Sequence, residues 1–118
     1  MPSISREELP GYSHGAYTTE EAKWDGFTVA FESVTDDTDA VERFQTLPGG
    51  GCQCPHWGYQ LAGESSYVFS DRVETFHPGE FFYIAPGHAP RHKAGSQWVC
   101  FSPTDKHDET QKITRAQA

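Results

Sequence analysis

The sequence predicts a single all-β domain, built from short strands as a sandwich or barrel. A chain of 118 residues has the size of one domain. Its 11 glycines and 8 prolines favour frequent tight turns over long helices. Short alternating or wholly apolar runs lie between these turns at regular spacing, which is typical of an all-β sandwich or barrel.

Strands are expected wherever residues alternate in polarity or form a short apolar run. In residues 27–32, Phe27, Val29 and Phe31 share one face, which predicts a half-buried strand. Residues 81–84, Phe-Phe-Tyr-Ile, are apolar on both faces and predict a buried strand. The other expected strands cover residues 41–47, 57–61, 65–69, 73–76 and 97–101.

Turns and termini divide the chain. Polar, glycine and proline clusters predict turns at residues 35–39, 70–72, 77–80 and 85–87, and a break in regular structure at 48–51. We expect the body of the domain over residues 15–103. An irregular N-terminal arm is expected at residues 1–14 and a loose polar C-terminal tail at residues 104–118.

Composition and charge exclude several classes of function. No apolar run approaches the ~18 residues that span a membrane. The N-terminus has no apolar signal-peptide region, so we expect a cytoplasmic protein. The net charge is −8, and no basic stripe is present to contact phosphate groups. Nucleic acids and anionic membranes are therefore not expected partners.

The stretch CQCPHWGY, at residues 52–59, gathers the most reactive side chains. Three cysteines in a chain without a secretory signal argue against a disulfide framework. In an extended segment, residues two apart share a face. Cys52, Cys54 and His56 therefore point the same way, and Gln60 continues their face. This pattern predicts either a metal-binding strand or a row of packing residues.

The chain resembles the cupin superfamily over residues 27–103. The resemblance rests on Gly63, the hairpin after it and the run PGEFFYIAPGH at residues 78–88. More narrowly, CQCPHWGY, the PGH turn at 86–88 and FSP at 101–103 resemble a family of small single-domain bacterial cupin proteins. The resemblance implies an antiparallel, double-sheet jelly-roll β-barrel. It also implies a homodimer, and one metal or substrate site inside each barrel.

The usual cupin metal motif has other residues at several of its positions here. Counting back from Gly63, the usual glutamate position holds His56 and the second histidine position holds Cys52. The first histidine position falls on Gly50, which offers no ligand atom. The last histidine of the second usual motif falls on Pro90. The resemblance therefore implies a site at the usual place with a different set of ligands.

The metal ligands implied here are His56, His88, Cys52 and Cys54. Thiolate and imidazole groups together suit Zn²⁺ or Fe²⁺ and suit Mg²⁺ or Ca²⁺ poorly. Gln60 and His92 are the candidate substrate-binding residues, because both are expected to face the same interior, and His92 is also a reserve ligand.

Other interpretations of these residues stay open. The cysteines could pack as small apolar groups while the histidines form hydrogen bonds in a polar cavity. Cys54 and His56 could also form a nucleophilic thiolate–imidazolium pair, although nothing in the sequence supplies an oxyanion hole.

The sequence thus predicts a small cupin that binds a metal ion inside its barrel and acts on a small organic molecule. Cupins of this size, as the resemblance implies, include dioxygenases, isomerases, cyclases and lyases. One alternative is a non-catalytic cupin that binds or senses a small molecule without a metal, and another is a protein with structural zinc. The acidic, aromatic-rich domain favours a neutral or weakly polar ligand over a strongly anionic one.

Overall fold

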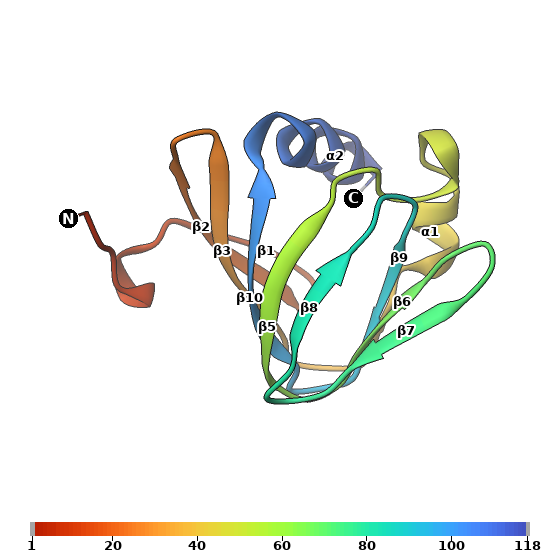
Figure 1. Cartoon of the computed structure of the whole chain (residues 1–118), viewed down its shortest axis with the longest axis horizontal. Helices are drawn as coiled ribbons and strands as arrows, with labels where there is room; N and C mark the ends of the chain where they lie inside the picture. The colour runs from red at the N-terminus through yellow and green to blue at the C-terminus, as the bar shows by residue number, and fades with distance from the viewer. Residues whose placement is uncertain (1, 118) are drawn as a thin grey trace.

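Two antiparallel β-sheets face each other and enclose the interior of the protein (Figure 1). The computed structural model describes residues 2–117 and the side chains of residues 2–114. The six-stranded sheet has the order β1-β2-β3-β10-β5-β8, and the four-stranded sheet has the order β4-β9-β6-β7. The all-β double-sheet architecture predicted from the sequence is confirmed.

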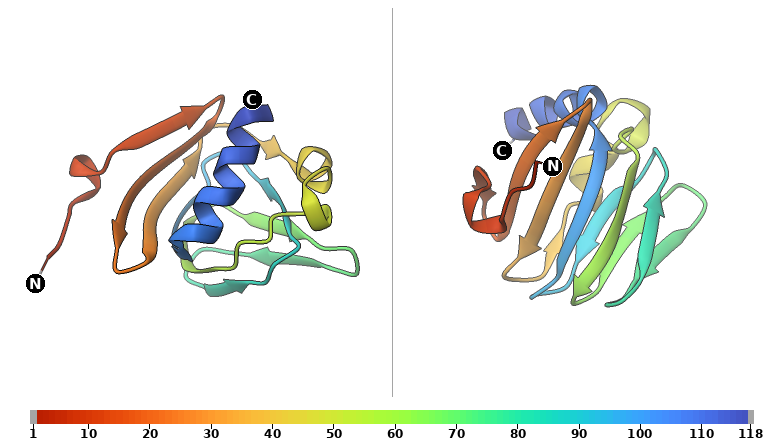
Figure 2. Two further views of the ribbon diagram at one scale, coloured as in Figure 1. Left: turned by 90° about the horizontal axis from the view of Figure 1, so that it is seen from above. Right: turned by 60° about the vertical axis from the view of Figure 1, so that its left-hand side comes forward.

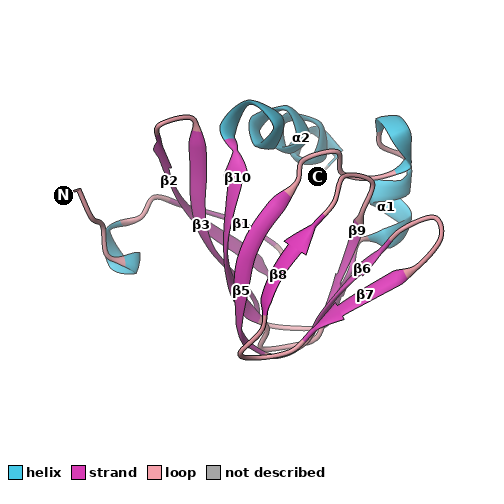
Figure 3. Cartoon of the chain, in the orientation of Figure 1, coloured by secondary structure: helices cyan, strands magenta, loops and turns pink. Residues whose placement is uncertain are grey.

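The strands are short, as the spacing of the turns predicts. Their bounds are β1 Gly11–His14, β2 Tyr17–Trp24, β3 Phe27–Val34, β4 Thr38–Asp39, β5 His56–Ala62, β6 Ser65–Val68, β7 Val73–Phe76, β8 Phe81–Ile84, β9 Ala89–His92 and β10 Gln97–Pro103. The helices are η1 Arg6–Glu8, α1 Val41–Gln45, η2 Pro48–Gly50 and α2 Thr104–Gln117 (Figure 3). Among the described residues, no helix is long and apolar enough to cross a membrane.

Three segments differ from the sequence-based expectation. The strand predicted at residues 41–47 is wrong, because α1 forms there. The expected loose tail at residues 104–118 is wrong over its described part, which forms α2. The arm expected at residues 1–14 is only partly irregular, because β1 pairs with β2. Strands β1, β2, β4 and β9 were not predicted.

The apolar residues of β3 lie on the face opposite to the one expected. Thr28, Ala30, Glu32 and Val34 are the buried row, and Phe27 lies with the other row on the outside. Strand β8 is buried on one face only, because Phe82 and Ile84 are buried but the alternate residues are exposed. The prediction that β8 is buried on both faces is therefore wrong.

The outer surface of the six-stranded sheet carries an unusual concentration of exposed apolar side chains. Phe81 is 85% exposed and Trp57 is 43% exposed. Adjacent strands bring these rings together, with Trp57 opposite Tyr83 in the β5–β8 pair and opposite Phe101 in the β5–β10 pair. We call this surface the aromatic face, and it consists of Phe27, Trp57, Leu61, Phe81, Tyr83 and Phe101.

Both α-helices lie at one end of the barrel. Figure 1 places α1 and α2 above the same ends of the strands, and Figure 2 shows from above that α2 runs across the opening between the sheets. The helices follow β4 and β10 directly in the chain. This end of the barrel is also where the stretch CQCPHWGY begins, so the helices surround the candidate site.

Candidate metal centre and cavity

A backbone bridge holds Cys52 and His88 side by side. The Cys52 amide donates to the His88 carbonyl at 2.7 Å, and the Gly87 amide donates to the Cys52 carbonyl at 2.7 Å. This close approach depends on Gly51, because a Cβ atom there would lie 2.7 Å from the backbone of Gly87. Gly87 itself has φ +97°, a conformation that glycine adopts without strain. The sequence PGH therefore positions the histidine against the cysteine.

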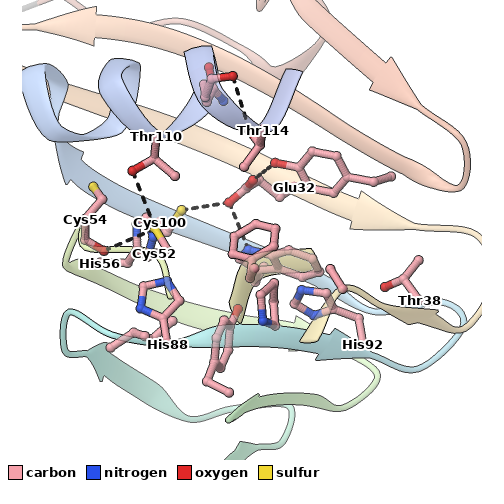
Figure 4. Close-up of a pocket in the computed structure, with 18 of the residues that line it drawn as sticks. Glu32, Thr38, Cys52, Cys54, His56, His88, His92, Cys100, Thr110 and Thr114 are labelled. Carbon is pink, nitrogen blue, oxygen red and sulfur yellow. Dashed lines mark hydrogen bonds between the residues drawn. The ribbon is translucent and has the colours of Figure 1, made fainter. Parts of the chain in front are cut away.

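His56 completes a cluster of three possible metal ligands. It begins β5, and its ring centroid lies 5.0 Å from that of His88. One ligand atom each of Cys52, His56 and His88 lies within 4.8 Å of the others. Within the described part of the chain, no other group of three or more such side chains is this close together. Figure 4 shows the three side chains converging at one end of the cavity.

Hydrogen bonds orient both imidazole rings. The Nδ1 of His88 lies 2.8 Å from the Ala85 carbonyl oxygen, which only accepts, so Nδ1 carries the proton. The Nδ1 of His56 lies 2.6 Å from the Oγ of the buried Ser102 on β10. In His88, Nε2 is therefore the nitrogen left for a metal ion. In His56, Nε2 is left in the same way when Nδ1 donates its proton to the Ser102 hydroxyl. Protein metal sites commonly orient their histidines in this way.

Burial sets the protonation of the cluster. Burial, together with the nearby charges of His88 and His107, holds the pKa of His56 well below its usual value. Burial also lowers the pKa of His88 to about 4, although the Ala85 hydrogen bond opposes this effect. Both rings are thus neutral near pH 7, which is the form that binds metals. Burial raises the pKa of the Cys52 thiol, so a metal ion must displace its proton.

Cys54 lies next to the cluster but outside it. Its side chain is fully buried and lines the same cavity. The Sγ lies 3.5 Å from the carbonyl oxygen of the adjacent Pro55. Burial, with a smaller contribution from Cys52, raises the pKa of the Cys54 thiol to about 12. A thiol held in its protonated form is a poor nucleophile, so the Cys54–His56 pair considered from the sequence has no support here.

A cavity of about 400 Å³ adjoins the cluster and extends between the two sheets. His92 lines this cavity, with its ring stacked on Trp98 at a centroid distance of 4.1 Å. Gln60 is also fully buried, but it is not among the residues that line the cavity. Its Nε2 donates to Ser65 Oγ, which in turn lies 2.7 Å from His92 Nδ1. Gln60 thus supports the cavity wall from behind, and a role for either residue in substrate binding stays a prediction.

The arrangement of strands matches that of several solved structures. The polyketide cyclase RemF from Streptomyces resistomycificus has a TM-score of 0.60 at 19% identity, over 87% of this chain and 79% of that one. An RmlC-like cupin from Shewanella frigidimarina has a TM-score of 0.60 at 11% identity, over 85% and 88%. The nucleoside dehydratase Pac13 from Streptomyces has a TM-score of 0.59 at 11% identity, over 87% and 82%.

The chain has the cupin fold. The predicted cupin fold is therefore confirmed, and at these low identities the likeness extends to the fold alone. No protein-family model and no curated protein matches the sequence. The narrower resemblance, which rests on CQCPHWGY, PGH and FSP, stays a prediction.

The cupin barrel contains a buried carboxylate that the sequence did not reveal. Glu32, on β3, accepts hydrogen bonds from Trp98 Nε1 at 3.0 Å, from Cys100 Sγ at 3.0 Å and from the Tyr17 hydroxyl. It lines the same cavity as the cluster (Figure 4). A lone glutamate in an alternating strand is usually solvated, so only the inverted face of β3 identifies Glu32 as part of the site.

Helix α2 closes the mouth of the cupin barrel through polar contacts. His107 Nε2 and Gln111 Nε2 lie 3.0 and 2.8 Å from the same oxygen of Glu21 on β2. Thr110 Oγ1 lies 3.8 Å from the Cys52 thiol, so the helix also covers the cluster. Burial alone would raise the pKa of Glu21, but the bonds and charge of His107, with bonds from Thr19 and Gln111, lower it to about 2.

Low pH is expected to reduce the free energy of unfolding, because Glu21 then becomes protonated. The pKa of this carboxyl falls from an ordinary value of 4.5 to about 2 in the fold. The part that the ionised carboxylate contributes is therefore present above pH 4.5 and is lost as the pH falls toward 2. Burial alone would lower the pKa of His107, but Glu21 raises it, so the part that depends on the charge of His107 is lost as the pH rises through that raised pKa. A shift of this size corresponds to on the order of 3 kcal/mol. Denaturant unfolding of wild type and Glu21→Gln should show a stability difference that shrinks toward zero over this range.

The control for this prediction is Glu20→Gln. Glu20 is the neighbouring residue on β2 and pairs with the half-exposed Arg6 at 3.1 Å. Loss of such an exposed ion pair is expected to change the free energy of unfolding by less than about 1 kcal/mol. A Glu21→Gln difference that stays constant from neutral pH to the acid limit would contradict the role given to the ionised carboxylate.

Proposed function

We propose that this cupin binds a divalent metal ion through Cys52, His56 and His88 and acts on a small organic molecule in the adjoining cavity. The observation that carries the proposal is the cluster, with three donors within 4.8 Å of one another at the cavity wall. The hydrogen bond from His88 to Ala85 adds support, because it leaves Nε2 free to bind a metal. Cys54 remains a further candidate ligand.

The donor set fits zinc or iron. Donor atoms around a tetrahedral zinc ion lie roughly 3.3–3.8 Å apart, given bonds of about 2.0–2.3 Å. Because the three ligand atoms lie within 4.8 Å of one another, the cluster needs to contract by no more than roughly 1–1.5 Å to reach this spacing. One thiolate and two imidazoles lack the carboxylate of the common two-histidine iron centre, which favours zinc over iron. Three protein ligands leave a position open, and a metal there would supply a Lewis acid for the substrate.

Metal analysis tests this proposal directly. Protein purified without a metal-chelating tag is expected to contain about one zinc or iron ion per chain. His56→Ala is expected to lose the metal. His77→Ala is the matched control, because His77 is an exposed histidine whose ring pairs with Glu64 and Glu80 on the surface. This variant is expected to keep the metal.

Absence of metal in the wild type would overturn the proposal, provided that reconstitution with Zn²⁺ and with Fe²⁺ under reducing conditions also fails. The alternative, a cupin that binds or senses a small molecule without a metal, would then be favoured, and molecules that copurify in the cavity would identify its ligand.

We also propose that the protein is a homodimer that associates through the aromatic face. Monomeric proteins rarely expose contiguous apolar patches of this kind. Over the described lengths of β3, β10, β5 and β8, the outward-facing residues include no charged side chain. The chain as a whole has a net charge of −8. Two copies can therefore bring these faces together while keeping their acidic surfaces apart.

A further inference from the structure

Arg43 stands at the rim of the cavity with hydrogen-bonding capacity that the protein does not use. It lies on α1, and its side chain is half-buried among the residues that line the cavity. Its Nε is buried, and among the described residues it has no hydrogen-bond partner. A buried donor without a partner costs free energy, and the cost is larger for a charged group. An acceptor supplied by a ligand would remove this cost.

The carboxylates that line the cavity are, by contrast, already partnered. Glu32 accepts the three hydrogen bonds described above. Asp39 accepts from Arg91 Nε at 3.1 Å and from the Val41 amide at 3.0 Å. His107, which also lines the cavity, is bonded to Glu21. Among the described charged side chains that line the cavity, Arg43 is thus the one for which neither an ion pair nor a side-chain hydrogen bond is found, and it is a cation.

The rest of the cavity suits the apolar body of a ligand. The stacked His92 and Trp98 rings, together with Phe82 and Ile84, form much of its wall. Phe44 flanks the guanidinium, which lies 5.6 Å from the ring centroid. An arginine side chain binds a carboxylate through two parallel hydrogen bonds, a geometry that it matches better than lysine does.

We propose that the cavity takes a small organic acid with an aromatic or aliphatic body, and that Arg43 binds its carboxylate at the rim. This inference deepens the proposed function by naming the substrate class, and as a statement about a substrate it rests on that function. It differs from the neutral ligand expected from the acidic composition. Net charge describes the whole surface, whereas a ligand responds to the charges at its own site.

A pair of isosteric probes tests the inference. Benzoate and benzamide have nearly the same shape, and only benzoate carries a charge. Calorimetric titration of wild type is expected to show benzoate binding about tenfold to a hundredfold more tightly than benzamide. Arg43→Gln is expected to remove this preference and to leave benzamide binding unchanged, which also shows that the cavity is intact. Arg72→Gln, which removes a surface arginine paired with Asp71 and Glu74, should keep it.

Each titration is carried out on zinc-loaded and on chelator-treated protein, because a bound metal can also attract a carboxylate. A benzoate preference that depends on Arg43 in both forms supports the inference, even if the protein fails to retain zinc and the metal proposal falls. A preference that appears only with zinc and survives Arg43→Gln would overturn the inference while the metal proposal stands. Absence of benzoate binding to wild type at roughly 10 mM in both forms would also overturn it.

Discussion

Replacing Cys52 by alanine is expected to lower the affinity for zinc by more than about a hundredfold, while replacing Cys54 leaves it within about tenfold. Loss of a hydrogen-bonding partner behind a ligand already costs about 10–100-fold, and loss of the ligand itself costs more. Cys52 belongs to the three-residue cluster, and Cys54 does not. The two cysteines thus form a matched pair two residues apart, both buried and both lining the same cavity.

Competition against a chromophoric chelator under reducing conditions measures this difference. Thermal unfolding supplies a second readout, because a ligand at about 1,000 times its Kd stabilises the folded state by about 4 kcal/mol. Wild type and Cys54→Ala are therefore expected to melt at a higher temperature with excess zinc than without it. Cys52→Ala is expected to show little change. Equal losses in the two variants would mean that the segment rearranges to bring both thiols to the metal.

The burial of alternate residues along this segment could be predicted from the sequence because only the alternation of an extended chain was needed. Cys52, Cys54 and Gln60 are buried, as the parity argument requires. The choice between the two cysteines could not be made in the same way. It depends on the bridge between Cys52 and His88, residues that lie 36 positions apart and meet only because Gly51 allows two backbone segments to touch.

Alternation in a strand tells which residues share a face, but it does not tell which face is buried. In β3 the aromatic row lies outside, and the row with Thr28 and Glu32 lies inside. Hydrophobicity points to the wrong row because this barrel encloses a partly polar cavity and its outer surface is apolar. Because of the same inversion, the sequence did not indicate that Glu32, which accepts three hydrogen bonds at the cavity, is buried.

Helix α2 was also not predicted from the sequence, because the residues that hold it in place are distant in the chain. Its sequence, TDKHDETQKITRAQ, has no continuous apolar stripe. Among the residues that the structure describes, polar contacts tie the helix to β2: His107 bonds to Glu21, and Asp108 pairs with Lys23. Because these partners come from a strand more than 80 residues away in the chain, local sequence carries no sign of them. A polar terminus with few apolar residues is typically loose, and here specific polar pairs, one of them buried, hold the helix in place.

Replacing Phe81 by glutamate is expected to convert the proposed dimer to a monomer. Stable dimers bury about 800 Å² of surface on each partner, and Phe81 is the most exposed side chain of the aromatic face. The substitution would place an unpaired carboxylate from each copy in an apolar interface, which costs several kcal/mol and weakens association by about a thousandfold or more. Size-exclusion chromatography with light scattering should give twice the chain mass of 13.2 kDa for wild type, and the single-chain mass for Phe81→Glu.

Val73→Glu provides the control that locates the interface. Val73 is also an exposed apolar residue, but it lies on β7 of the four-stranded sheet, away from the aromatic face, so its replacement is expected to leave the dimer intact. Both side chains are mostly exposed in the single chain, and neither change should alter the fold of a monomer, as circular dichroism can verify. A wild type that is monomeric, or a Phe81→Glu variant that stays dimeric, would remove the aromatic face as the interface. Dissociation by Val73→Glu alone would place the contact on the four-stranded sheet instead.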